Sequence, residues 1–246
     1  MKGILFVLGV LTALPLHAEV DSAALATALA SEQRPAEDRV RDANRKPVDV
    51  MQVLGFEPGM TVLDVIAAGG YFTEVLSHTV GATGKVYAQN SRFVLDMRDG
   101  ANEKAISGRL AGGRLANVER LDRDIADMGL APGSIDGAIT ALNFHDVYNG
   151  QGADAAQGFL TAIYTALKPG GVFGVIDHVG IAGQDNAKLH RVEKSIAIEQ
   201  AKAAGFVVEA DSDVLHNLTD DHTKAVFDPA VRGQTDQFLL KLRKPG

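Results

Sequence analysis

The sequence contains no cysteine, which excludes disulfide bonds, thiolate catalysis, cysteine-ligated metals and lipid attachment through a cysteine. Basic residues are outnumbered, because 24 Lys and Arg stand against 31 Asp and Glu and give a net charge of −7. Nucleic acid and anionic lipid repel such a chain, so we expect neither as a partner. The 246 residues, 46% of them hydrophobic, are enough to bury a core.

The first segment, MKGILFVLGVLTALPLHAEV, combines Lys2, an apolar run to Leu16, and the small Ala18 before Glu19. This order is typical of a secretory signal peptide, and the run is short for a membrane span. A buried first helix and a membrane anchor are the alternatives. We expect cleavage after Ala18. The remaining chain then has a net charge of −8, because the removed segment contains Lys2 and no acidic residue. Export without cysteine is compatible with a bacterial periplasm, so we expect a periplasmic or secreted protein that is free of the membrane after cleavage.

Beyond residue 20 the pattern alternates between helix and strand. Residues 21–32 and 35–55 are predicted to be helical, with an interruption at Pro35 and a bend at Pro47. Seven short apolar runs are predicted to be strands: residues 61–65, 85–89, 118–121, 135–142, 171–177, 206–210 and 237–242. Segments long enough for helical crossovers separate the first five, so we expect an α/β fold with a doubly wound, mostly parallel sheet. The last two strands are predicted to pair antiparallel, because no long helix lies between them.

The stretch TVLDVIAAGGYFTEVLS, residues 61–77, reads as a buried strand that turns at two glycines into a helix. In such a sheet ligands bind beyond the carboxyl ends of the strands, and the first strand–turn–helix is a usual contact. Glycines let the backbone turn tightly, and the start of a helix offers N–H groups to anionic atoms. The stretch matches neither G-x-G-x-x-G nor G-x-x-x-x-G-K-S/T, so the turn alone leaves the ligand open.

Five strings follow one another along the chain: VLDVIAAGG, GKVYAQN, NVERLDRD, GSIDGAITALNFHDV and LKPGGVFGVIDH. In order and spacing, residues 59–180 resemble the successive motifs of class I S-adenosylmethionine-dependent methyltransferases. The flanking strings EDRVRDANRKP, LHRVEKS and DDHTKAVFDPAVRGQTDQFLLKLRKP resemble a narrower family of exported methyltransferases. The resemblance implies a Rossmann-like domain at residues 59–246, after a signal peptide at 1–18 and a helical extension at 19–58.

The resemblance also implies S-adenosylmethionine as the cofactor. Asp64 matches the acid that holds its amino-acid end, Asn90 stands where an acid usually grips the ribose, and Asp124 matches the acceptor for the adenine amino group. As structural alternatives, Asp64 could cap a turn or helix and Asp124 could be a surface acid. The remaining implied contacts lie in the turn and after the fourth strand: Ile66, Ala67, Ala68, Gly69, Gly70 and Asn143.

The family pattern of the turn is D-x-G-x-G-x-G, and here Ile66 and Ala68 occupy its first two glycine places. A side chain at these places points at space where the backbone approaches the ligand, and isoleucine tolerates a positive φ badly. Asn90 also lacks the charge that strengthens a carboxylate's hydrogen bonds. We therefore expect weak cofactor binding.

Histidines and acids follow the fourth and fifth strands, in NFHDVYN and DHVG, so His145, Asp146, Asp177 and His178 are expected at one rim of the sheet. Methyl transfer needs an aligned acceptor that loses its proton, and a histidine titrating near neutral pH beside an acid suits that step. We predict His145, Asp146 and His178 as catalytic residues and assign no metal ligand. Structural roles for the histidines, and metal binding by the four side chains, are the alternatives.

Two further groups are predicted to be structural. His190 and Glu193 lie one turn apart in a predicted helix, AKLHRVEKSIAIEQAKAAG, which favours a surface or interface pair over a ligand. Residues 211–235 form a polar excursion whose charged residues suggest a lid or a plain ion-pair network, and the network is favoured. The charged residues concerned are Asp220, Asp221, Arg232 and Asp236.

The sequence therefore predicts an exported S-adenosylmethionine-dependent methyltransferase that acts on a small-molecule acceptor. Two alternatives from other classes stay open, since a fold does not fix a function. One is a non-catalytic binding protein on the same fold, and the other is a metal-dependent enzyme of a different reaction class.

The signal peptide yields a direct test. Protein isolated from its native host is expected to begin at Glu19, because the small Ala18 follows the apolar run as a cleavage site requires. Intact-mass spectrometry of the purified protein measures this. A soluble cytoplasmic chain that retains Met1 would contradict export.

Overall fold

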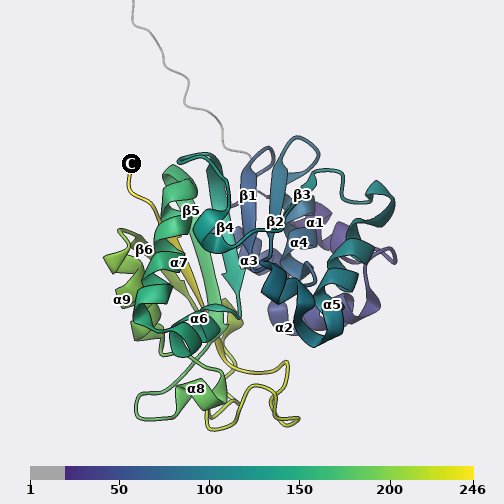
Figure 1. Cartoon of the computed structure of the whole chain (residues 1–246). Coiled ribbons are helices and arrows are strands. Elements are labelled where there is room, and N and C mark those ends of the chain that lie inside the picture. The colour runs from purple at the N-terminus through teal and green to yellow at the C-terminus, as the bar shows by residue number, and fades with distance from the viewer. Residues whose placement is uncertain (1–19) are drawn as a thin grey trace, which may run out of the picture.

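The computed structural model describes residues 20–246, so the predicted signal peptide and its cleavage site after Ala18 lie outside the described residues. Seven strands form one sheet in the order β3-β2-β1-β4-β5-β7-β6 (Figure 1). Their bounds are β1 Thr61–Val65, β2 Lys85–Gln89, β3 Val118–Leu121, β4 Ile135–Ala141, β5 Leu167–His178, β6 Val207–Ser212 and β7 Gln237–Arg243.

The first five strands are parallel to one another, whereas β7 runs antiparallel to both of its neighbours, β5 and β6. The predicted mostly parallel sheet is confirmed, as is the antiparallel pair at its end. The strand order reverses between β1 and β4. In sheets of this kind the crevice beyond the carboxyl ends at such a reversal is where ligands bind.

Helices cover both faces of the sheet (Figure 1). Because successive residues of a strand point to opposite faces, Val62 packs with α1, α3 and α4, whereas Leu63 and Val65 pack with α6, α7 and α9. The bounds are α1 Ser22–Leu29, α2 Ala36–Arg45, α3 Pro47–Leu54, α4 Tyr71–Val80, α5 Arg92–Leu110, α6 Phe144–Gln151, α7 Ala153–Ala166, α8 Asn186–Leu189 and α9 Lys194–Ala203. Short 3-10 helices lie at Ala111–Gly113, Ile125–Asp127 and Asp213–Leu215. Among residues 20–246, no helix combines the length and apolar character that a membrane crossing needs.

The predicted bend at Pro47 is a break between two helices. Lys46 has left-handed backbone angles (φ 40°, ψ 54°), and Pro47 is the first residue of α3. The residue before a proline is sterically disfavoured in the right-handed helical region, and proline suits the first position of a helix. The interruption at Pro35 is confirmed, because this residue is the N-cap of α2.

Two helices differ from the sequence prediction. The predicted helix at 187–205 is split, because His190 has φ 54° and separates α8 from α9. His190 and Glu193 therefore do not share a helix. Helix α6 begins at Phe144, directly after β4, and the sequence analysis did not predict it because its polar sequence FHDVYNGQ shows little apolar periodicity.

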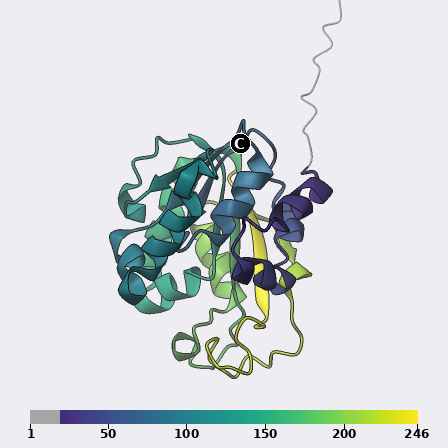
Figure 2. The ribbon, with the colours of Figure 1, turned by 90° about the vertical axis from the view of Figure 1, so that its right-hand side faces the viewer.

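The segments after β5 and β6 meet beyond the carboxyl ends of β4 and β5, as both views of the ribbon show (Figures 1 and 2). The N–H of Val226 donates to the carbonyl of Leu189 at 3.2 Å. Arg191 and Asp220, both with fully buried side chains, form a bidentate ion pair with N–O distances of 2.9 and 3.1 Å. Asp220 thus forms an ion pair as predicted, but its partner is Arg191, which was not among the charged residues predicted to form the network.

The two glycines of the turn after β1 are required by packing against α5. Gly70 has φ +83°, and a Cβ there would lie 2.5 Å from Cδ1 of Ile106. A Cβ on Gly69 would lie 3.0 Å from Cβ of Ala105. Their small size thus lets α5 approach the turn closely.

We expect Gly70→Ala to lower the free energy of unfolding by about 2–4 kcal/mol, because it adds a left-handed alanine and an overpacked contact. Chemical denaturation measures this. The matched control is Gly108→Ala, since a Cβ at this helical position meets no atom within 4 Å. The control is expected to be neutral or stabilising by up to about 1 kcal/mol. Equal effects of the two changes would contradict the packing role of Gly70.

Candidate active site

A cavity of about 970 Å³ opens beyond the carboxyl ends of the parallel strands. Its lining includes Ala68 after β1, Ser91 after β2, Asp124 after β3 and Asn143 after β4. Side chains of α5, α6 and α7 complete the wall, and most of the lining surface is apolar. A cavity of this size and character is suited to a small organic ligand.

Several predicted site residues line this cavity. Four of them were predicted to bind the cofactor: Ile66, Ala68, Asp124 and Asn143. The other three were predicted to be catalytic: His145, Asp146 and His178. The other predicted cofactor residues do not line it: Asp64, Ala67, Gly69, Gly70 and Asn90. Asp64 contacts Thr73 of α4, whereas Ala67, Gly69 and Gly70 pack against α5.

Ile66 and Ala68, at the two positions where the family pattern has glycine, adopt left-handed backbone angles, with φ of 55° and 49°. Amide side chains from the end of β2 hold them there. Gln89 Oε1 accepts from the N–H of Ile66 at 2.9 Å, and Asn90 Oδ1 accepts from the N–H of Ala68 at 2.8 Å. These bonds offset the cost of placing side chains in the left-handed region.

Asn90 is fully buried, and both ends of its amide bind Ala68. Its Nδ2 donates to the carbonyl of Ala68 at 3.2 Å. The residue predicted to grip a ribose is therefore engaged with the backbone of the turn. Ser91, the next residue, does line the cavity.

Asp64 lies beneath the turn and is 3% exposed. Its Oδ2 accepts from the hydroxyl of Thr73 at 2.6 Å. Burial raises the pKa of Asp64 to about 7, although hydrogen bonds from Thr73 and the charges of Arg109 and Arg45 lower it. The position favours the structural alternative, in which Asp64 ties the end of β1 to the first turn of α4.

His145 stands at the N-terminal end of α6 and is held by a buried carboxylate. Asp177 Oδ1 lies 2.6 Å from Nδ1 of His145, and Oδ2 accepts from the backbone N–H of His145 at 2.8 Å. Burial alone lowers the pKa of His145, but the carboxylates of Asp177 and Asp146 raise it to about 10. The expectation of a histidine that titrates near neutral pH is therefore wrong for His145, because two acids flank its ring.

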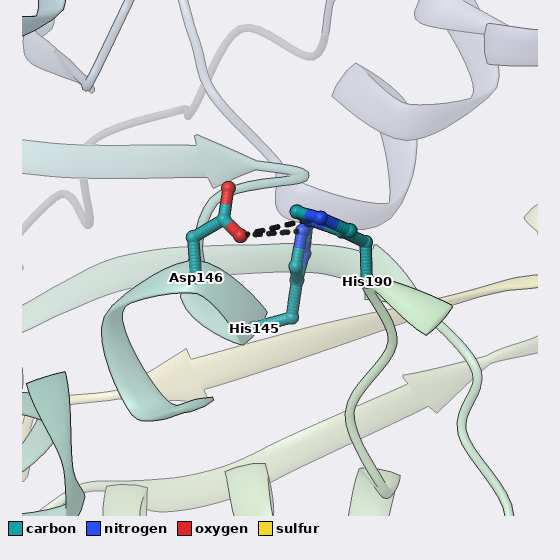
Figure 3. A group of neighbouring side chains, drawn as sticks. All are labelled: His145, Asp146 and His190. Carbon is teal, nitrogen blue, oxygen red and sulfur yellow. Dashed lines mark hydrogen bonds and ion pairs between the residues drawn. The ribbon is translucent and has the colours of Figure 1, made fainter. Parts of the chain in front are cut away.

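Asp146 joins His145 to His190 (Figure 3). Oδ1 of Asp146 lies 3.3 Å from Nε2 of His145 and 3.0 Å from Nδ1 of His190. His190, predicted as a surface or interface residue, therefore belongs to this group. The break between α8 and α9 instead turns it toward the predicted catalytic residues, and the left-handed conformation that does this leaves no clear signal in the sequence.

His178 lies on the same wall but has a different environment. Its side chain is buried, and the hydroxyl of Thr235 is 2.7 Å from its Nδ1. Burial lowers the pKa of His178 to about 4, despite the opposing charge of Asp177. His178 is thus neutral at physiological pH, and its ring centre lies 5.7 Å from that of His145.

No protein-family model matches the chain, and no curated protein matches it in sequence. Many solved structures match its fold. A SAM-dependent methyltransferase from Aquifex aeolicus superposes with a TM-score of 0.63 and 20% identity, over 91% of this chain and 98% of that one. The chain therefore shares its fold with this S-adenosylmethionine-dependent methyltransferase.

Two other similar structures show what this fold carries elsewhere. The cyclase SpnF matches with a TM-score of 0.61 and 18% identity, over 94% of this chain and 87% of that one. A possible exported protein from Bordetella parapertussis matches with a TM-score of 0.54 and 14% identity, over 87% of this chain and 71% of that one. At such identities the likeness establishes the methyltransferase-like fold, and activity has to be argued from the site.

The environment of Asp64 predicts a pH-dependent stability. In the folded chain its carboxyl keeps a proton up to about pH 7, whereas its ordinary pKa is 3.8. Unfolding therefore releases a proton between these values, and the contribution of Asp64 to the free energy of unfolding falls as the pH rises through them. We expect the melting temperature of Asp64→Asn, relative to the wild type, to increase from pH 5 to pH 8. Asp127→Asn, at an exposed position, is the control, and an unchanged difference for Asp64→Asn would contradict the assignment.

Proposed function

We propose that this protein binds S-adenosylmethionine in the cavity beyond β1–β4 and transfers the methyl group to a small-molecule acceptor. The observation that carries the proposal is the position of the cavity. Residues that follow four successive parallel strands converge on it, at the reversal of strand order where this fold binds ligands.

The residues present fit such a cofactor. Asp124 would accept from the adenine amino group, Ser91 would lie near the ribose, and the turn at Ile66 and Ala68 would face the remainder. The cofactor supplies a methyl group on a sulfonium sulfur, which an acceptor takes by in-line displacement. Because Asn90 is engaged with the turn, few polar groups are left for the ribose, and weak binding is expected.

The acceptor would lie on the far side of the cavity, against α6. His145 and Asp146 line that wall, and Asn143 stands between them and the turn. Asp177 fixes the ring of His145, and Nε2 of that ring faces Asp146, so the two side chains give this wall a fixed shape against which an acceptor can be oriented. Such orientation is a large part of what a methyltransferase has to provide, since the displacement needs three aligned atoms.

A second candidate is a protein that binds a nucleoside-like ligand without transferring a group. This candidate is favoured because Asp64 and Asn90, which the family resemblance assigns to the cofactor, are buried and form hydrogen bonds within the protein.

Export is part of the proposal. It is supported by the order of charge, apolar run and small residue in the first 18 residues. The fold is also similar to that of the possible exported protein from Bordetella parapertussis.

Calorimetry with S-adenosylmethionine tests the cofactor site. We expect measurable binding that Asp124→Ala weakens by about 10-fold, the size of a lost hydrogen bond to a charged group. Asp127→Ala is the matched control, because this acid lies on the same short 3-10 helix segment but does not line the cavity. The absence of binding at millimolar S-adenosylmethionine would contradict the proposed methyltransferase.

Transfer of a labelled methyl group to small molecules from the native host separates the two candidates. We expect His145→Ala to lower the rate by about 100-fold, because the acceptor loses an orienting contact, while the folded variant keeps a cofactor affinity close to wild type. The change also leaves the buried carboxylate of Asp177 without its partner, so we expect the free energy of unfolding to fall by about 3–5 kcal/mol. Binding without transfer to any molecule would favour the second candidate. An unchanged rate in His145→Ala would exclude this residue from the acceptor site.

A further inference from the structure

Two imidazoles and one carboxylate form a cluster, from His145, His190 and Asp146 (Figure 3). His145 and Asp146 come from the start of α6, and His190 comes from the segment between α8 and α9. One ligand atom from each residue lies within 4.8 Å of the others. Since His145 and Asp146 line the cavity, the cluster is reachable from it.

The ring of His145 is oriented before any ligand arrives. Its Nδ1 is bound to Asp177, which is fully buried and also accepts from the backbone N–H groups of His145 and His178. Nε2 is left to face Asp146 and His190. In many metal sites, the ring nitrogen of a histidine that does not bind the metal is hydrogen-bonded to a carboxylate, which fixes the orientation of the ring and raises its basicity.

His190 is also positioned by its surroundings. It has φ 54°, an unfavourable conformation for histidine, and the next residue, Arg191, anchors it through the buried ion pair with Asp220. Asn149 of α6 donates to the carbonyl of Arg191 at 2.8 Å, which fixes the segment against the helix that carries His145 and Asp146. Backbone strain that neighbouring contacts hold in place occurs often at functional sites.

We propose that His145 Nε2, His190 Nδ1 and Asp146 Oδ1 bind a divalent transition-metal cation. Bonds of about 2.0–2.2 Å to a tetrahedral ion place its ligand atoms roughly 3.3 Å apart. The two distances from Asp146 Oδ1, 3.3 Å to His145 and 3.0 Å to His190, are close to that spacing. Two imidazoles and one carboxylate suit zinc, cobalt, manganese or ferrous iron, and leave coordination positions for another ligand.

The remaining positions of the cation would face the cavity that His145 and Asp146 line. A small molecule with oxygen donors, such as a hydroxy acid or a diol, is the class of ligand that such positions take. Identifying this molecule with the methyl acceptor rests on the proposed function, whereas the cation site itself does not.

Cobalt(II) titration of the purified, chelator-treated protein tests the site, because protein-bound Co²⁺ in a low-symmetry nitrogen and oxygen site absorbs visible light. We expect one Co²⁺ per chain, displaced by Zn²⁺. His190→Asn is expected to weaken binding by at least 10-fold while preserving the fold, since asparagine tolerates left-handed angles. Asp177→Asn replaces the carboxylate that holds Nδ1 of His145 by an amide of similar size, and it is expected to weaken Co²⁺ binding by about 10–100-fold.

His216→Ala is the matched control, because His216 is another partly exposed histidine beside an acid, 3.5 Å from Asp213, and lies outside the cluster. It is expected to bind Co²⁺ as the wild type does, and melting curves of the metal-free variants show that each is folded. The absence of stoichiometric Co²⁺ binding, or equal affinity in wild type and His190→Asn, would overturn the cation site. Neither result depends on S-adenosylmethionine, so the proposed function is judged separately by its own binding and transfer measurements.

Discussion

The turn between β1 and α4 is the constraint on which the rest of the site depends. Ile66 and Ala68 are held in left-handed conformations that glycine would adopt freely, and side chains from two neighbouring strands hold them. Gln89 and Asn90 bind their N–H groups from β2, and Asn143 donates to the carbonyl of Ile66 at 3.3 Å from the end of β4. Hydrogen bonds from these three side chains therefore offset the strain of having Ile66 and Ala68 where the family pattern has glycine. The amide groups that form these bonds are engaged with the backbone of the turn.

A buried arginine connects this turn to the N-terminal helices. Arg109 of α5 donates to the carbonyl of Gly69 at 2.9 Å, to Asp38 of α2 at 2.6 Å and to Glu74 of α4. All three charged side chains are at most 7% exposed, and removing one partner of such a network typically costs about 3–5 kcal/mol. The helices of residues 22–54 are therefore fixed to the turn after β1 by charge as well as by the apolar core around Met51 and Leu54.

The histidine cluster has a different origin, because it consists of residues from segments that are distant in the sequence and adjacent in the folded chain. Parallel strands place their carboxyl ends at one edge, so the sequence could predict that His145, Asp146 and His178 meet there. It could not predict that Asp177 would hold His145, nor that His190 would join Asp146 from 44 residues away. The flanking acids raise the pKa of His145, whereas burial lowers the pKa of His178. At neutral pH the first histidine is therefore charged and the second is neutral.

The sequence by itself determined the strands, their parallel or antiparallel orientation and the edge of the sheet at which the cavity lies. These features follow from strand patterns, crossover lengths and turn glycines, each of which can be read from a short stretch of the chain. Three predicted site residues also line the cavity: Asp124 and Asn143, which the family resemblance implied, and His145, which was predicted from its place after the fourth strand. Tertiary structure decided which polar groups form bonds within the protein and which lie at the histidine cluster. Asp64 and Asn90 bind Thr73 and Ala68, whereas the left-handed conformation of His190 places its ring beside Asp146. These outcomes depend on contacts between segments that are distant in the sequence.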